Sequence, residues 1–452
     1  MSRKRRSRGD QPPVQGKAQG PDKKGRFWLP LPNSEKKLLF YGGVPGEEVV
    51  VRRGKRGRRG EQGDLLRVTS PSMDRRFPVC RHFGVCGGCT LQHLPEAIAL
   101  RVKSQPHYEL LGQLAPQARL LPPISSPGSF CYRTKVELTF LRDHSGQTTL
   151  GFHRRGRFDR GVDLGKCWLS PMSPRLPAGL RAWMSRHGLR GWHPRTNDGD
   201  LRYLLYRHAS RGNQDLAALV INSDLSLTET AVRELKECLQ ECGVGGALLI
   251  SQSSVAGAVV ADETEALYGE QLLVESLGKL TFELGWNSFF QVNPRAYERL
   301  LAAMREWREA PVGSRILDLF CGVGSIGMSL YQEGDDLLGV ELVEQAVIDA
   351  RRNASRNNIP ARFEQRSAED WDRFETDLLV LDPPRSGCHP KLVKLLREKA
   401  PAEELFYVSC NPHRLAEELP EILERYRLIR AQGFDFFPQT HHLELLLHLK
   451  RR

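Results

Sequence analysis

The feature that most constrains this chain is an alternation in its last third, where short apolar runs are separated by stretches with helical spacing. The runs cover residues 316–320, 336–340, 378–381 and 405–408. Strand-length and helical segments that alternate in this way are typical of a parallel sheet covered by helices. We therefore expect a doubly wound, Rossmann-like α/β domain over residues 285–452.

The first run leads into a glycine-rich loop and then into a helical stretch. The loop carries Gly322, Gly324 and Gly327, and glycines there permit a tight turn and a close approach of the backbone to a ligand. The next strand ends at Glu341, where a carboxylate can accept hydrogen bonds from ribose hydroxyls. The pattern indicates a nucleotide-type cofactor, although an ordinary glycine-rich turn with a surface glutamate would give the same pattern.

Two further strand ends favour S-adenosylmethionine over a nicotinamide cofactor. One continues into Asp-Pro-Pro-Arg from Asp382, and the other into Ser-Cys-Asn-Pro around Cys410. Ligands of open α/β sheets bind beyond the carboxyl ends of the strands. Phe320, Glu341, Asp382 and Cys410 are therefore expected to converge on one crevice.

Cys410 and Glu444 are candidates for a nucleophile and a base. Cys410 follows an apolar strand, so its thiol is expected at the lip of the sheet, whereas most cysteines are inert and buried. A thiolate that adds to carbon 6 of uracil makes carbon 5 nucleophilic, and a base must later remove the carbon 5 hydrogen. Glu444 begins the last apolar strand; the alternative is a glutamate on the solvent face of an edge strand.

A second group of cysteines lies far from Cys410 in the sequence. Cys80, Cys86 and Cys89, interspersed with glycines, form a pattern typical of a metal centre, and Cys167 is the expected fourth ligand. Four converging thiolates can hold an iron-sulfur cluster or a structural zinc ion. The spacing favours the cluster, because zinc sites more often have two Cys-X-X-Cys pairs, but it leaves zinc open.

The charge of the chain favours a polyanionic partner such as RNA. Its 452 residues include 66 Lys and Arg against 54 Asp and Glu, a net charge of +12, with basic runs at residues 3–26 and 52–59. The sequence has no secretory signal and no apolar run long enough to span a membrane. We therefore expect a cytoplasmic protein with reduced cysteines, no membrane partner and, by default, a monomeric state.

Four regions are expected along the chain. Residues 1–26 form a basic disordered tail, and residues 27–72, where strand-like runs are separated by glycines and a proline, form a small β-barrel. Residues 73–284 form a central α+β domain that carries the cysteine cluster. The α/β domain follows at residues 285–452.

Several sequence blocks together resemble the family of RNA uracil-5-methyltransferases that carry an iron-sulfur cluster, and in particular the bacterial 23S ribosomal RNA enzymes. The blocks are CRHFGVCGGC at 80–89, NSFFQVNP at 287–294, DLFCGVG at 318–324, DPPR at 382–385, SCNP at 409–412 and HLE at 442–444. The resemblance covers nearly everything from residue 80 onward and implies a role for each candidate residue. Those roles are catalysis by the nucleophile Cys410 and the base Glu444, contacts to S-adenosylmethionine from Gln291, Phe320, Glu341 and Asp382, and binding of a four-iron, four-sulfur (4Fe-4S) cluster by Cys80, Cys86, Cys89 and Cys167.

The resemblance also implies a partner and a reaction. Many relatives begin with a TRAM domain, an OB-like RNA-binding barrel, and residues 43–51 resemble its second half, whereas the usual first half is missing or much altered. The expected function is methylation of carbon 5 of a specific uridine in structured RNA, most simply 23S ribosomal RNA. The alternatives are the same chemistry on transfer RNA, a cytosine-5-methyltransferase, and a non-catalytic RNA-binding or assembly factor.

Overall fold

The structure is a computed structural model, and it describes residues 12–22, 24–31, 35–57, 60–143, 145–255, 257–372 and 375–452. Residues 1–11 and 23 of the predicted tail, and residues 58 and 59 of the second basic run, lie outside the described residues. The chain divides into two compact units. One comprises Met1–His107 and Phe437–His442, and the other comprises Tyr108–Phe436 and Leu443–Arg452. This division differs from the predicted boundaries at residues 73 and 285.

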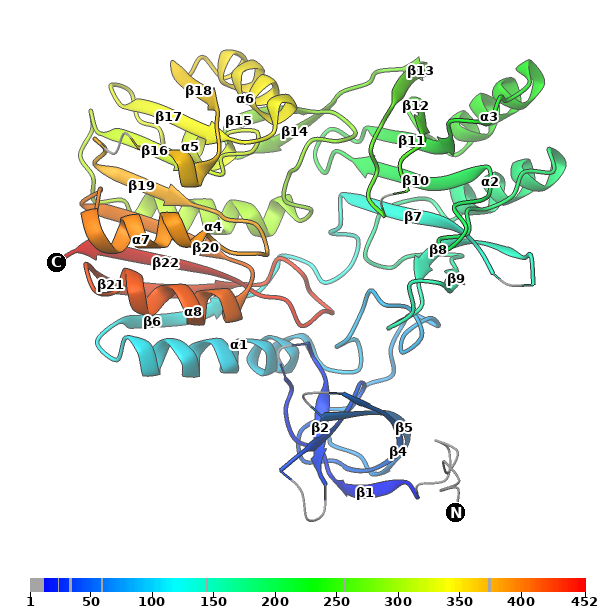
Figure 1. Ribbon diagram of the computed structural model, residues 1–452, viewed down its shortest axis with the longest axis horizontal. Helices are drawn as coiled ribbons and strands as arrows, with labels where there is room; N and C mark the ends of the chain where they lie inside the picture. Colours follow the sequence, from blue (N-terminus) through cyan, green and yellow to red (C-terminus); the bar gives the residue numbers. More distant parts are fainter. Residues whose placement is uncertain are drawn as a thin grey trace, which may run out of the picture. The chain divides into compact units, whose positions relative to one another are not determined.

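The first unit holds a five-stranded sheet with the strand order β1-β4-β5-β3-β2 (Figure 1). Its strands are β1 (Val14–Lys17), β2 (Phe27–Pro30), β3 (Lys37–Phe40), β4 (Glu48–Gly57) and β5 (Gly60–Ser70). Gln19, just after β1, exchanges two backbone hydrogen bonds of 2.9 and 2.8 Å with Trp28 of β2. The sheet therefore curls until its two outer strands meet, as the expected small barrel requires. Strand β1 lies inside the segment predicted as a disordered tail, so that prediction is wrong for residues 14–17.

The second unit begins with a seven-stranded sheet in the order β13-β12-β11-β10-β7-β8-β9. Its strands are β7 (Lys135–Arg142), β8 (Thr148–His153), β9 (Gly161–Asp163), β10 (Leu201–His208), β11 (Asp215–Asn222), β12 (Gly246–Gln252) and β13 (Glu263–Gly269). Helices α2 (Arg175–Arg186) and α3 (Glu229–Glu241) bury Leu180, Trp183 and Leu235 in the core of this sheet. This is the expected α+β region.

An eight-stranded sheet follows, with the order β18-β17-β16-β19-β20-β22-β21-β6. Its strands are β6 (Arg119–Ile124), β16 (Arg315–Leu319), β17 (Asp336–Glu341), β18 (Ala361–Gln365), β19 (Leu378–Leu381), β20 (Glu404–Ser409), β21 (Tyr426–Phe434) and β22 (Glu444–Arg451). The five strands from β16 to β20 are parallel, and β22 pairs antiparallel to both β20 and β21. The parallel strands confirm the predicted α/β domain, but β6 joins it from the region assigned to the central domain.

Helices connect the strands of this sheet and position its loops (Figure 1). They are α4 (Pro294–Trp307), α5 (Ser325–Leu330), α6 (Glu344–Arg356), α7 (Pro390–Lys399) and α8 (Pro412–Ile422), with α1 (Glu96–Leu114) before β6 and the hairpin β14 (Leu273–Leu277) and β15 (Leu280–Leu284) before α4. Asn293 caps α4, because its side chain accepts a hydrogen bond from the Ala296 amide. In the described ranges, no helix is long and apolar enough to cross a membrane.

The end of α4 is fixed by a buried ion pair. Arg308 donates to both carboxylate oxygens of Asp335 at 2.6 and 2.9 Å, and the two side chains are 1% and 0% exposed. The same carboxylate accepts the amides of Gly313 and Ser314, which lead into β16. The ion pair therefore holds α4 against the start of the first parallel strand.

Removing the carboxylate should strongly destabilise the protein. We expect Asp335→Ala to lower the free energy of unfolding by about 3–5 kcal/mol, because it leaves the Arg308 charge buried and unpaired. Asp336→Ala is the matched control, because Asp336 and its partner Arg362 are both more than half exposed, and we expect it to cost less than about 1 kcal/mol. Urea unfolding of both variants measures the difference, and equal losses would contradict the prediction.

Candidate active site

Three of the predicted cofactor residues emerge side by side from the parallel sheet. The ends of β16, β17 and β19 are in register, since Leu319 pairs with both Val340 and Leu381. Phe320, Glu341 and Asp382 follow those positions directly. The structure thus brings these three residues together at the carboxyl edge of the sheet, where open α/β folds bind ligands.

The predicted nucleophile and base are neighbours across two antiparallel strands. Ser409 of β20 pairs with Leu445 of β22, and one step further the same register places Cys410 beside Glu444. Glu444 is only 3% exposed and Cys410 is half-buried. Because β22 lies between β20 and β21, the alternative of a solvent-facing glutamate on an edge strand is wrong.

The glycine-rich loop is shaped around the carboxylate of Glu341. The Gly322 amide donates to one carboxylate oxygen at 3.1 Å and the Val343 amide donates to the other at 2.9 Å. Phe320 has a φ of +64° and Gly324 one of +81°. A bulky residue in the left-handed region is uncommon and occurs at ligand sites, where the surrounding structure enforces it. A Cβ atom on Gly324 would lie 2.6 Å from the end of the Met328 side chain and 3.0 Å from the Phe363 ring, so these side chains would have to move.

Asp318, a buried acidic residue of β16, was not among the predicted site residues. Its Oδ2 atom accepts the Gly327 amide at 2.9 Å, and its Oδ1 atom is buried without a hydrogen-bond partner in the described part of the chain. Burial, together with the negative charges of Asp382 and Glu341, raises its pKa to about 7. Burial also raises the pKa of Asp382 to about 7. Carboxyl groups gathered in this way fit a cationic ligand, and S-adenosylmethionine carries a sulfonium and an ammonium group.

The pKa of the Cys410 thiol and the pKa of the Glu444 carboxyl group are both raised. Burial, and then the negative charges of Glu444 and Asp382, raise the pKa of Cys410 to about 12, while Arg385 acts in the opposite sense. Burial and Asp382 raise the pKa of Glu444 to about 8. Without ligand the thiol is therefore protonated at neutral pH. The nucleophile needs added positive charge, or a proton acceptor, to react.

Arg385, the last residue of the Asp-Pro-Pro-Arg block, is a cation near both Cys410 and Glu444. Its carbonyl accepts a hydrogen bond of 2.8 Å from the side-chain amide of Asn411. Asn411 also caps α8 by accepting from the His413 amide. The Asp-Pro-Pro-Arg loop is thereby joined to the loop that carries Cys410, which the order of blocks in the sequence did not reveal.

Gln291, the fourth predicted cofactor residue, lies in the segment before α4 and is half-buried. Among the described residues it makes no hydrogen bond to the other candidates. The segment around it is held firmly, because Ser288 donates to Asp349 at 2.6 Å and the Thr134 amide donates to the Val292 carbonyl at 2.8 Å. Gln291 therefore sits on a loop that is fixed by the hydrogen bonds of its neighbours.

Three cysteines of the predicted cluster lie in one loop of the first unit. The Gly88 amide donates to the Cys86 sulfur at 3.4 Å, and the Gln92 side chain donates to the Cys89 sulfur at 3.1 Å while accepting from the Cys80 amide at 3.2 Å. Hydrogen bonds from N–H groups to sulfur are typical of thiolate ligands of iron-sulfur clusters.

The fourth predicted ligand of the metal centre does not lie in this loop. Cys167 belongs to the second unit, where it packs partly buried against the core of the seven-stranded sheet. Across the described ranges, no group of three or more His, Cys, Asp and Glu side chains is arranged to hold a metal ion. In the first unit, the Cys86 and Cys89 sulfurs each accept an N–H hydrogen bond, whereas Cys80 is joined to Gln92 through its backbone amide.

Comparisons with known proteins agree with the fold. Residues 360–452 match the family described as tRNA (Uracil-5-)-methyltransferase, and residues 298–403 match the methyltransferase small domain. An uncharacterised RNA methyltransferase of Caldanaerobacter subterraneus subsp. tengcongensis is 32% identical over 424 residues, which cover 91% of this chain and 93% of the relative. Another, from Thermosynechococcus vestitus, is 33% identical over 419 residues, which cover 89% and 90%.

A solved structure is similar over almost the whole chain. It is the Pyrococcus abyssi tRNA (uracil-54, C5)-methyltransferase in complex with S-adenosyl-L-homocysteine, with a TM-score of 0.77 and 26% identity over 96% of this chain and 100% of that one. Fold and comparisons together define an S-adenosylmethionine-dependent RNA methyltransferase. Within that class, the chain belongs to the RNA uracil-5-methyltransferase family.

The electrostatic coupling of Cys410 to Glu444 can be tested by alkylation. Above pH 8, where Glu444 is ionised, Glu444→Gln removes a negative charge beside the thiol and should lower its pKa. Alkylation of Cys410 by iodoacetamide, followed by mass spectrometry, should then be faster at a given alkaline pH, by about threefold per unit of pKa, because the larger thiolate fraction is partly offset by a less nucleophilic thiolate. The exposed Cys131 serves as the internal control. An unchanged rate at Cys410 would show that the two groups are not coupled.

Proposed function

We propose that this enzyme transfers the methyl group of S-adenosylmethionine to carbon 5 of a specific uridine in structured RNA through a covalent adduct with Cys410. The observation that carries the proposal is the pairing of β20 with β22, which puts a thiol and a buried carboxyl group next to each other. They stand at the same sheet edge as Phe320, Glu341 and Asp382. A uridine must leave any base stack to reach such a site.

The proposed chemistry uses both side chains. As the Cys410 sulfur bonds to carbon 6 of uracil, its proton passes to solvent, and the electron pair of the carbon 5–carbon 6 double bond moves onto the ring as an enolate. Carbon 5 then bonds to the methyl group, and the sulfonium becomes the neutral thioether of S-adenosylhomocysteine. Glu444 takes the hydrogen from carbon 5, the double bond re-forms, and the Cys410 thiolate leaves.

The environment of Glu444 suits it to this step. Its pKa, raised to about 8 by burial and by Asp382, lies near neutral pH, where a general base combines sufficient basicity with a useful ionised fraction. Arg385, which favours the charged forms of both Cys410 and Glu444, would stabilise the thiolate and the carboxylate as each forms.

We propose that Gln291, Phe320, Glu341 and Asp382 contact S-adenosylmethionine, as the family resemblance implies. The carboxylate of Glu341, held by two backbone amides, would accept hydrogen bonds from the ribose hydroxyls. Asp382 and the unpaired Oδ1 atom of Asp318 add negative charge for the cationic groups of the cofactor.

The substrate proposed first is 23S ribosomal RNA, because the sequence blocks most resemble the bacterial ribosomal enzymes. Transfer RNA is the second candidate, since the matched family and the similar solved structure are both named for transfer RNA. In either case the curled sheet of the first unit would bind RNA as OB-like barrels do. The enzyme would act in the cytoplasm as a monomer.

A labelling experiment tests the reaction and the substrate together. Anaerobically purified protein receives methyl-labelled S-adenosylmethionine and separate pools of undermethylated 23S, 16S and transfer RNA, which are then digested to nucleosides. We expect label in 5-methyluridine from one pool only. Cys410→Ala should abolish the label, whereas Cys131→Ala, at an exposed thiol of the same unit, should not. Normal turnover by Cys410→Ala, or label only in 5-methylcytidine, would contradict the proposal.

We further propose that Cys80, Cys86, Cys89 and Cys167 bind a 4Fe-4S cluster. The support is the resemblance of residues 80–89 to cluster-bearing relatives and the N–H donors directed at the Cys86 and Cys89 sulfurs. In the absence of a second cluster motif, the cluster would be structural, holding the loop in place.

Metal analysis of anaerobically purified protein tests this assignment. We expect about four iron and four sulfide per chain, with visible absorption, and loss of both in Cys89→Ser. Cys131→Ser is the control and should keep the wild-type content. Stoichiometric zinc in place of iron, or iron retained in Cys89→Ser, would contradict the assignment.

A further inference from the structure

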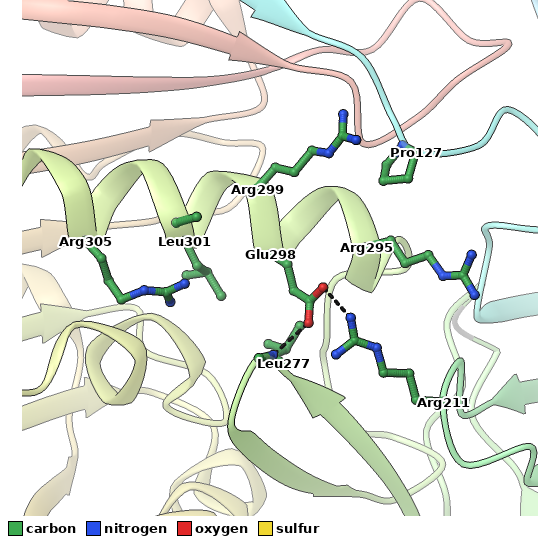
Figure 2. Close-up of a pocket in the computed structure, with 10 residues that line it drawn as sticks. Pro127, Arg211, Leu277, Arg295, Glu298, Arg299, Leu301 and Arg305 are labelled. Carbon is green, nitrogen blue, oxygen red and sulfur yellow. Dashed lines mark hydrogen bonds and ion pairs between the residues drawn. The ribbon is translucent and has the colours of Figure 1, made fainter.

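A cavity of about 500 Å³ lies in the second unit beside α4, and its lining includes none of the candidate site residues (Figure 2). Four segments of the chain line it: Pro127 between β6 and β7, Arg211 in the turn between β10 and β11, Leu277 and Gly278 in the β14–β15 turn, and one side of α4. The reaction proposed above uses none of these residues.

Arginines dominate the wall that α4 contributes. Arg295, Arg299 and Arg305 all line the cavity and all are exposed. Arg295 and Arg299 are one helical turn apart, and Figure 2 shows the three side chains projecting from the helix. With Arg211, four guanidinium groups border one cavity.

The single carboxylate of the lining, that of Glu298, already has hydrogen-bond donors from the protein. Glu298 accepts a hydrogen bond of 2.6 Å from Arg211 and one of 2.7 Å from the Gly278 amide, so each of its oxygens has a donor. Four arginines against one glutamate leave the lining with a net charge of +3. The cavity is therefore an anion-attracting surface.

The arginines differ in how many of their N–H groups already donate a hydrogen bond within the protein. Arg299 uses one guanidinium nitrogen on the Ser125 carbonyl, at 2.8 Å. Arg295 and Arg305 make no hydrogen bond or ion pair with any described residue. Their N–H groups are therefore available for a ligand, and guanidinium groups match phosphate oxygens in two-point contacts.

We propose that this cavity binds the sugar-phosphate backbone of the RNA substrate. Its volume is in the range of about 300–1,000 Å³ that ligand pockets occupy, so it has room for more than one small inorganic anion. The exposed ring of Pro127 supplies an apolar surface beside the charges, against which ribose can pack. The proposal rests on the proposed function only in that RNA is the substrate.

The position of α4 would let a phosphate bound in the cavity position the RNA relative to the predicted cofactor loop. The helix begins three residues after Gln291, and its first residues are fixed by the Asn293 cap. A phosphate held by Arg295 in the first turn is therefore placed by the same rigid element that follows the predicted cofactor loop. The cavity would fix the register of the RNA, while base recognition lies elsewhere.

The salt dependence of RNA binding tests the proposal. Filter binding of unmodified transfer RNA and 23S ribosomal RNA fragments is measured over a series of KCl concentrations for wild type and for the double variant Arg295→Ala, Arg305→Ala. Each lost phosphate contact should reduce the slope of log affinity against log salt by roughly 0.7–0.9. For two contacts at physiological salt this corresponds to a loss of affinity on the order of tenfold. Arg305→Glu should lose more than Arg305→Ala.

The controls separate this proposal from the proposed function. Arg427→Ala removes an exposed arginine at the end of β21 away from Glu444 and should keep the wild-type slope. Binding of S-adenosylhomocysteine, measured by calorimetry, should be unchanged in every variant. If the double variant no longer binds it, the salt slope of the single variant Arg305→Ala is compared with that of the wild type instead. A wild-type slope in the variant compared would overturn the cavity as an RNA site. A reduced slope without any methylation by the wild type would uphold the cavity and defeat the proposed reaction.

Discussion

The site depends on carboxyl groups held close together away from water. Asp318, Asp382 and Glu444 all have pKa values raised by burial, and the neighbouring negative charges raise those of Asp318 and Glu444 further. The fold tolerates this because backbone amides of the glycine-rich loop donate to Asp318 and Glu341. The loop conformation is thus tied to charge compensation, and a cationic cofactor would relieve the remaining repulsion.

Much of the fold could be predicted because its strands are local apolar runs with polar ends. Strands β17 (Asp336–Glu341) and β19 (Leu378–Leu381) lie where the apolar runs at residues 336–340 and 378–381 predicted them. Strand β6 was not expected, since Pro122 and Pro123 argue against a strand. It occurs at the edge of the sheet, where missing N–H groups cost little, and its partner β21 is about three hundred residues away. Such a pairing has no local sequence signal.

The candidate site, like the fold, could be predicted from the sequence only in part. Glu341, Asp382 and Cys410 could be placed together because each ends or follows a parallel strand. Asp318 could not be separated from an ordinary residue of an apolar strand, since its role comes from burial beside other carboxyl groups. The arginine cavity is invisible in the sequence for a further reason. Arg211 and Arg295 meet only through the packing of α4, and each alone resembles a solvated surface charge.

The place of β22 in the sheet has a consequence for protein synthesis. The strand follows β21 in the chain but lies between β20 and β21. While the ribosome is still making residues 444–451, β20 has an open edge and β21 has no partner on that side. The sheet can close, and the nucleophile can acquire its base, only after this segment has emerged. Until then the nascent chain carries an unpaired apolar strand edge, which is open to pairing with other chains.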